Sequence, residues 1–214
     1  MRERLWPQAL AVLVAAVLYA TLPTALVMHQ ASVRYVLPAF EVALIAMLTL
    51  PSLHNRLVES GLRRAVSIAL IALISIGNAV ALGLLIHQLL YHGGIQGRSL
   101  LFAAFDLWVT NVIVFALWYW ELDGGGPVRR AHRAPKKDRD FAFVQQTDPE
   151  VEADGWRATF VDYLYVAFTN ASAFSPTDTM PLSRRAKMLM LVQSAVSIIT
   201  LLLVAARAVN ILSS

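Results

Sequence analysis

A polar segment interrupts the apolar sequence near the end of this chain, and its residue types could bind a cation. The segment reads FTNASAFSPTDT, from Phe168 to Thr179. Hydroxyl, amide and carboxylate oxygens are groups that line cation paths in membrane channels when several copies surround an axis. The candidates for the lining of a pore or filter are therefore Thr169, Asn170, Ser175, Thr177, Asp178 and Thr179.

The same turn also has an explanation that involves no function. Ser175 can cap a helix, Pro176 suits the first helical position, and Asp178 stands where a capping box places its acid. A pore-lining turn and an ordinary connection between helices both remain possible on the sequence alone.

Polar side chains form a second pattern along the last apolar segment. At 100° per residue, four of them fall within about 40° of one line. They are Gln193, Ser197, Thr200 and Arg207. This stripe predicts either helix packing through hydrogen bonds or a polar cavity, toward which an intramembrane charge usually points. The candidates for a buried charge that could pair with the arginine are Glu41, Asp106 and Asp162.

No residue pattern typical of catalysis or of metal binding is found. The chain has no cysteine, which excludes thiolate ligands and disulfides. Its five histidines show neither H-x-x-x-H nor H-E-x-x-H spacing, and G-x-S-x-G is absent. We therefore expect no enzymatic activity, no metal and no cofactor.

The candidate polar residues lie within or beside long apolar segments, which must form the elements that position them. The chain has 214 residues, of which 57% are hydrophobic and 15% are charged; soluble domains have roughly 25% charged residues. A helix of about 20 apolar residues crosses a hydrocarbon core of roughly 30 Å. The sequence predicts an all-α integral membrane protein with five full transmembrane helices, near residues 7–27, 33–50, 65–90, 100–120 and 186–212.

Three regions follow from this pattern. Residues 1–120 form a four-helix transmembrane region, residues 121–157 a basic and acidic loop, and residues 158–214 a short helix, the polar turn and the last transmembrane helix. Loop 121–157 holds seven Lys and Arg residues. The positive-inside rule therefore places this loop and the N-terminus in the cytoplasm.

The segment Thr159 to Phe174 is predicted as a re-entrant or a short sixth helix. Sixteen residues make about 24 Å of helix, which is short for a crossing. If the segment crossed fully, Arg184, Arg185 and Lys187 would lie outside, against the positive-inside rule. A helix that dips in and returns keeps them in the cytoplasm, whereas a tilted fifth span remains the alternative.

The loop after the fourth segment carries a basic cluster, which predicts a contact with anionic lipid or serves only to fix the orientation. Its members are Arg129, Arg130, Arg133, Lys136, Lys137 and Arg139. Because these residues lie beside an apolar segment, we expect the lipid bilayer as a partner and no nucleic acid.

The last quarter of the chain resembles the C-terminal part of an uncharacterised family of bacterial integral-membrane proteins. In that family a D-x-x-Y-x-A/S-F-T segment leads to F-x-x-[ST]-D-T, a basic pair and a last helix ending in V-N. The matching residues here are Asp162, Tyr165, Ala167, Phe168, Thr169, Phe174, Thr177, Asp178, Thr179, Arg184, Arg185, Val209 and Asn210.

More remotely, this arrangement resembles the pore helix, filter and inner helix of potassium channels. That resemblance implies a homo-oligomer, a tetramer if channel-like, with monovalent cations as its possible ligands. No glycine follows Gly155, so any filter would use side chains rather than the backbone carbonyls of T-V-G-Y-G. The alternative is a small-solute transporter, or a membrane-embedded accessory or structural protein, with a buried polar core of Glu41, Asp106 and Arg207.

Overall fold

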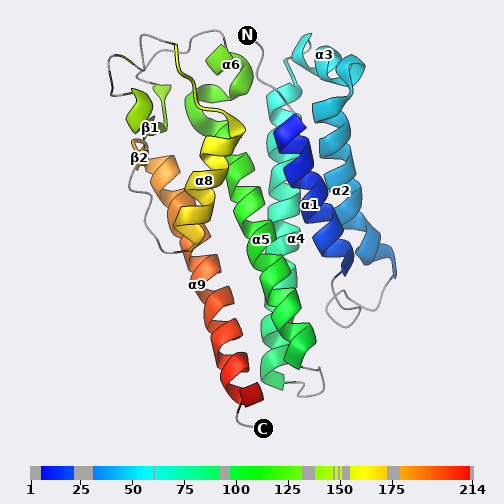
Figure 1. Ribbon diagram of the computed structural model, residues 1–214. Helices are drawn as coiled ribbons and strands as arrows, with labels where there is room; N and C mark the ends of the chain where they lie inside the picture. Colours follow the sequence, from blue (N-terminus) through cyan, green and yellow to red (C-terminus); the bar gives the residue numbers. More distant parts are fainter. Residues whose placement is uncertain are drawn as a thin grey trace.

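The computed structural model is an elongated bundle of helices, and it describes residues 6–21, 31–59, 61–91, 97–131, 138–146, 148, 150, 155–172 and 179–212. Five helices run along the bundle (Figure 1). They are α1 (Trp6–Thr21), α2 (Ala31–Thr49), α4 (Arg63–Tyr91), α5 (Gly97–Leu122) and α9 (Arg184–Leu212). The predicted helical fold class is confirmed.

Three of these helices are long and apolar enough to cross a membrane. Their spans are Arg63–Leu89 in α4, Ser99–Gly125 at α5 and Arg184–Ala205 in α9. In α1 and α2 the apolar stretches within the described residues are shorter, Trp6–Leu18 and Pro38–Met47. The described part of the chain thus supports three of the five predicted crossings.

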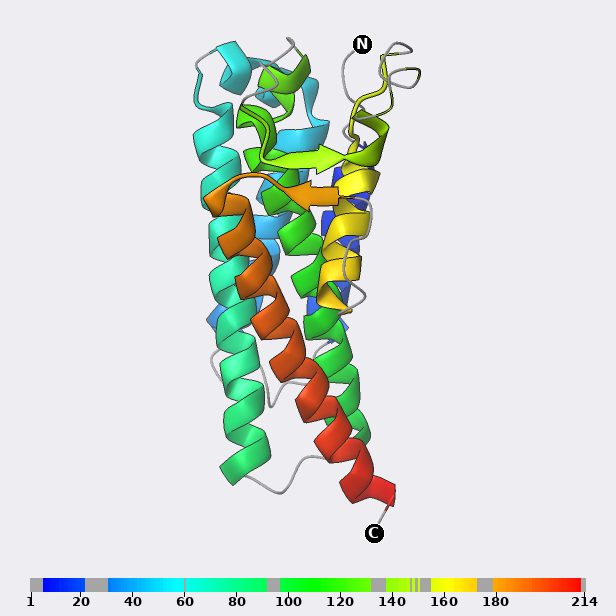
Figure 2. The same ribbon diagram turned by 90° about the vertical axis from the view of Figure 1, so that its left-hand side faces the viewer.

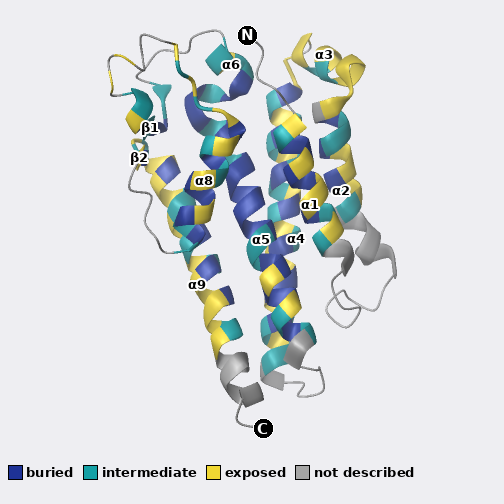
Figure 3. Cartoon of the chain, viewed as in Figure 1, coloured by how far each residue is buried: buried dark blue, intermediate teal, exposed yellow. Residues whose placement is uncertain are grey.

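Helix α5 is the centre of the bundle, because α1, α4, α8 (Phe160–Ala171) and α9 all pack against it. In its span 72% of the residues are buried, against 33% in α4 and 17% in α9 (Figure 3). A helix that is apolar on every side has to be surrounded by protein or lipid. The outer helices therefore present most of the apolar surface that a bilayer would cover.

The short elements gather at the end of the bundle where α1 begins, which we call the loop end. Helices α3 (Pro51–Glu59), η1 (Asp123–Gly125), α6 (Pro127–Ala131) and η3 (Val144–Gln146) lie there with two short strands (Figure 1). Strands β1 (Phe141–Phe143) and β2 (Thr179–Pro181) pair antiparallel, with Ala142 opposite Met180 (Figure 2). This strand pair was not predicted, since three-residue strands leave almost no periodic signal.

Helix α8 covers most of the predicted segment 159–174, from Phe160 to Ala171. Thr159 and Asp162 form a capping box, which fixes Phe160 as the first residue of the helix. Its twelve residues make about 18 Å of helix, too short for a crossing. The helix begins at the loop end and stops near the middle of the bundle, while β2 and the start of α9 lie back at the loop end (Figures 1 and 2). The chain therefore enters and leaves the bundle on the same side.

Candidate functional site

A hydrogen-bonded group at mid-bundle joins α5, α8 and α9. Gln193 of α9 is fully buried, and its side-chain amide donates to the carbonyl oxygen of Ala167 at 2.7 Å. Its Oε1 atom accepts hydrogen bonds from the Tyr119 hydroxyl at 2.5 Å and from the Asn170 amide at 2.9 Å. Both the carbonyl and the amide of Gln193 are thus engaged, so the side chain fastens α8 to α9 and to α5.

Further polar side chains extend this fastening along the same helices. Asn111 of α5 donates to the Ser197 hydroxyl at 2.9 Å. Asn170 also donates to the carbonyl of Met190 at 3.0 Å, and it accepts from the Ser194 hydroxyl at 3.2 Å. We call this set the Gln193 cluster, made of Asn111, Tyr119, Asn170, Gln193, Ser194 and Ser197. Because an apolar surrounding offers no water, such bonds select one arrangement of the helices.

The predicted stripe on the last helix faces the interior of its own chain. Gln193, Ser197 and Thr200 are each at most 1% exposed, and the Thr200 hydroxyl donates to the Val196 carbonyl of its own helix at 2.8 Å. The opposite face of α9 is apolar and open, with Leu191 62% exposed and Leu202 63% exposed. The side chain of Arg207 lies outside the described residues. The helix-packing explanation accounts for the three polar residues that are described.

The predicted filter residues are only partly described. Thr169 is buried, and its hydroxyl donates to the carbonyls of Tyr165 and Val166 within α8. Asn170 belongs to the Gln193 cluster. Thr179 begins β2 and is 3% exposed. Ser175, Thr177 and Asp178 lie outside the described residues.

A buried ion pair stands at the loop end, where α4 begins and α5 ends. Arg63 and Glu121 are 4% and 0% exposed, and the Nη1 atom of Arg63 lies 2.8 Å and 2.9 Å from the two carboxylate oxygens. The Ser67 hydroxyl donates to the same carboxylate at 3.2 Å. The guanidinium lies over the ring of Trp120, 5.3 Å from its centroid, as cations favour the face of an indole.

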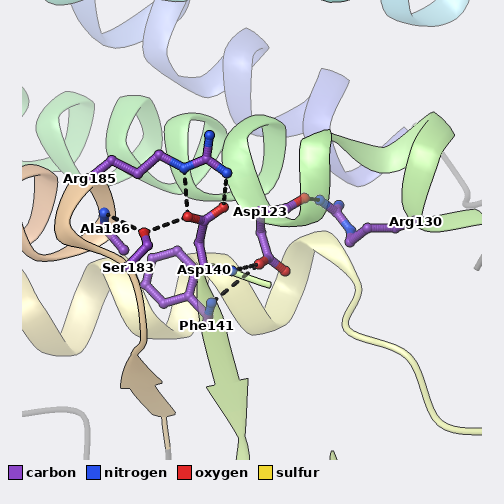
Figure 4. Close-up of polar contacts among 7 residues, drawn as sticks. All are labelled: Asp123, Arg130, Asp140, Phe141, Ser183, Arg185 and Ala186. Carbon is purple, nitrogen blue, oxygen red and sulfur yellow. Dashed lines mark hydrogen bonds and ion pairs between the residues drawn. The ribbon is translucent and has the colours of Figure 1, made fainter. Parts of the chain in front are cut away.

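Two aspartates tie loop 121–157 to α8 and α9, and Figure 4 shows their contacts within the loop and with α9. The Asp123 carboxylate accepts the backbone N–H groups of Asp140 at 2.7 Å and Phe141 at 3.2 Å, and also the Tyr163 hydroxyl at 2.6 Å. The Asp140 carboxylate accepts two bonds of 2.6 Å from the Arg185 guanidinium, and one from the Ser183 hydroxyl. The loop, the start of α8 and the start of α9 therefore form one connected unit.

The glycine run after Asp123 is part of this unit. Gly124, Gly125 and Gly126 have φ values of 59°, 85° and 98°, a left-handed conformation that side chains with a Cβ rarely adopt. A Cβ on Gly126 would lie 3.1 Å from the carbonyl oxygen of Glu121. The turn thus lets the chain fold closely over the end of α5.

The predicted basic cluster is divided between different roles. Arg130 points inward, where it donates to the carbonyls of Trp120 and Asp123 and lies over the Tyr163 ring. Arg129 pairs with Asp138 at 2.6 Å in an exposed position, and Arg139 is half-buried. The other members, Arg133, Lys136 and Lys137, lie outside the described residues.

The three acidic candidates are found in three different places. Glu41 of α2 is fully buried, Asp106 of α5 is 8% exposed, and Asp162 is half-buried where it caps α8. The Asn111–Ser197 bond sets the register between α5 and α9, whose directions are opposite. In that register Arg207 and Asp106 both lie toward the far end of the bundle, whereas Asp162 lies at the loop end.

Sequence reasoning did not single out the residues that organise the loop end. Arg63, Glu121, Asp123 and Asp140 stand at the edges of apolar segments, where single charges usually mark only the membrane boundary. The only hint in the sequence was that two aspartate-containing stretches, DGGGP at 123–127 and DRDF at 138–141, occur in the same loop. Only the fold shows that these two stretches meet.

No group of three or more His, Asp or Glu side chains among the described residues could hold a metal ion. Comparisons with protein-family models, with curated proteins and with solved structures found no match to this chain.

Proposed function

We propose that this chain is a multi-pass protein of the bacterial inner membrane that assembles into an oligomeric ion-conducting pore. In this proposal α8 and the polar turn after it form a re-entrant hairpin, and all five long helices cross the bilayer. The observation that supports it best is that α8 and α9 begin at the same end of the bundle.

Side-chain contacts hold the start of α8 and the start of α9, the two ends of the proposed hairpin, against loop 121–157. Tyr163 near the start of α8 bonds to Asp123, and Arg185 at the start of α9 bonds to Asp140. Strand pairing of β1 with β2 holds Thr179 beside the same loop. Residues 173–178 therefore connect a helix end at mid-bundle with a strand at the loop end.

This connection favours an assembly of several copies. Its sequence, AFSPTD, is too polar to face lipid, because polar groups without partners are costly in hydrocarbon. One hairpin cannot enclose a water path by itself. A closed ring of identical chains would place the turns around an axis, where Thr177 and Asp178 could bind a monovalent cation.

The outer faces of α8 and α9 are suited to such contacts. Val161, Tyr165 and Phe168 of α8 are between 48% and 60% exposed, and α9 exposes Met188 and Leu191. Since the described members of the α9 stripe, Gln193, Ser197 and Thr200, are buried within their own chain, the proposed pore is lined by the turn and not by these residues.

A second candidate function is a small-solute transporter, or an accessory or structural protein of the membrane, with a buried polar core. The engagement of the Gln193 cluster inside one chain favours it, because this core needs no partner copy. In that case the hairpin would be a packing element and would conduct nothing.

Ion flux into liposomes separates the two functions. We expect purified protein to carry K⁺ or Na⁺ across the bilayer, and Asp178→Asn to lower the flux by about tenfold or more, since a loss of about 1.4 kcal/mol in ion binding gives that factor. The control Glu150→Gln removes an acid from an exposed loop position and should leave the flux unchanged. Unaltered flux in Asp178→Asn, or a monomer in mild detergent, would contradict the pore and favour the second function.

A further inference from the structure

Glu41 is a buried carboxyl group whose place in the bundle is not explained by any contact. It lies in α2 with 0% of its surface exposed, and both carboxylate oxygens lack a hydrogen-bond partner. A fully buried carboxyl group normally has hydrogen-bond partners. Glu121, for example, is bonded to Arg63 and Ser67. The environment of Glu41 must therefore penalise the charged carboxylate far more than the neutral acid.

The surroundings of Glu41 are apolar. Along the buried face of α2, Leu44 and Met47 follow it at intervals of three residues, and each is 1% exposed. Both belong to one hydrophobic cluster with side chains of α1 and α4, such as Val12 and Ile71. Glu41 thus lies on the helix face that packs against apolar neighbours.

Among the side chains that the structure describes, no charged group of a neighbouring element is placed to neutralise Glu41. Helix α2 packs against α1, α3 and α4, and the described side chains of α1 include no titratable group. The titratable or charged side chains described in the other two are His54, Arg56 and Glu59 in α3, and Arg63, Arg64 and His87 in α4. The side chains of Arg34 and Tyr35 in α2 itself, and of Tyr91 in α4, lie outside those described.

These groups lie near the ends of the bundle, away from the level of Glu41. Helix α3 and the start of α4 are at the loop end, and His87 is close to the other end of α4. Glu41 is eight residues before the end of α2 at Thr49, which is about 12 Å along the axis. Arg63 is moreover committed to Glu121.

The charge of the Glu41 carboxylate must then be neutralised by a proton and not by a metal ion. A cation such as Na⁺ or Ca²⁺ requires several oxygen ligands, and no cluster of acids is present among the described residues. A carboxylate buried without a partner instead takes up H⁺ and becomes neutral. One O–H bond forms on uptake, and the same bond breaks when the proton returns to water.

We propose that Glu41 is a proton-binding site, occupied while α2 is packed against α1 and α4, and emptied when α2 separates from them. Pro38 precedes Glu41 by one helical turn inside α2 and removes one backbone hydrogen bond there, so the helix bends more easily at this level. Proton binding and the packing of α2 are then linked, because the proton stabilises only the packed state. This inference does not depend on the proposed pore.

Labelling with an apolar carbodiimide tests the site directly. Dicyclohexylcarbodiimide reacts with a protonated carboxyl in an apolar place and remains attached as a stable acylurea, which mass spectrometry locates on the peptide. We expect the folded protein in mild detergent to carry the label at Glu41 near neutral pH, and labelling to decrease as the pH rises. Glu121, paired with Arg63, should stay unlabelled.

Three outcomes would overturn the proposal. They are no label at Glu41 in the folded protein across the pH range, equal labelling of Glu121 and Glu41, and equal labelling of Glu41 by a water-soluble carbodiimide. The variant Glu41→Gln should lose the label and keep its Tm within about 3 °C of the unchanged protein, since the amide is also neutral. If that variant unfolded, Glu41 would need its charge, and the proton site would be excluded.

Discussion

Among single residues, Arg63 and Glu121 illustrate how a charge is retained inside an apolar bundle. The transfer of either ion from water costs several kcal/mol, which the partner offsets only in good geometry. Here one guanidinium nitrogen contacts both carboxylate oxygens, and Trp120 covers the cation. The pair therefore stabilises the meeting of α4 and α5 only as long as both members are present.

We predict that removing one member is far more harmful than removing both. Arg63→Met or Glu121→Leu alone should lower the free energy of unfolding by about 3–5 kcal/mol, because a buried charge is left unpaired. The double variant should recover most of that loss, as thermal unfolding in detergent would reveal. The control Arg129→Gln breaks an ion pair whose arginine is 55% exposed and should have little effect. Equal losses in the single and double variants would contradict this account.

At the scale of elements, α8 depends on its neighbours. Twelve residues form only a marginal helix in isolation, so its packing on α5 and its bonds to α9 must hold it in place. The capping box at Thr159 fixes where it begins. The element that could carry the function is thus also the one that the Gln193 cluster secures.

We expect Gln193→Leu to loosen α8 selectively. The change removes the acceptor of the Tyr119 hydroxyl, one of the two acceptors of the Asn170 amide, and the side-chain donor to the Ala167 carbonyl. We expect this to cost about 1–3 kcal/mol. Hydrogen exchange of the α8 backbone amides should become faster, while exchange in α4 stays the same. Thr200→Val is the matched control, since Thr200 lies on the same face but bonds only within its own helix. Faster exchange in both variants would mean that the cluster has no specific role.

For the whole molecule, the proposed function depends on which elements lie at each end of the bundle. The loop end gathers loop 121–157, the start of α8 and the start of α9, and α9 then runs to the opposite end (Figure 1). If α9 crosses the bilayer, the C-terminus lies on the other side from that loop. The re-entrant hairpin and the five crossings that we propose both depend on this arrangement.

Cysteine labelling checks this arrangement, because the chain has no cysteine of its own. Single cysteines at Val144 and Leu182, which are 51% and 53% exposed, should react with a membrane-impermeant maleimide from the same side. A cysteine at Ser214 should react from the opposite side. If Val144→Cys and Leu182→Cys were labelled from opposite sides, α8 would be a crossing helix, and the hairpin would be excluded.

The helical class and the approximate bounds of the long helices could be predicted from the amino-acid sequence, because blocks of about twenty apolar residues are a local signal for long helices. The sequence also predicted a short helix near residues 159–174. The sequence could not decide whether each polar side chain faces a neighbouring helix or a cavity. Gln193 and Ser197 were equally consistent with a cavity and with packing, and only their bonds to α5 and α8 distinguish the two.

The contacts of the loop end belong to the tertiary structure alone. Asp123, Asp140 and Arg185 are separated by 17 and 45 residues along the chain, and no local pattern encodes that they meet. The same holds for Glu41, whose lack of a partner follows from which faces of α1 and α4 pack against α2. Local sequence sets the periodicity of an element, whereas the pairing of distant side chains depends on how all the elements pack together.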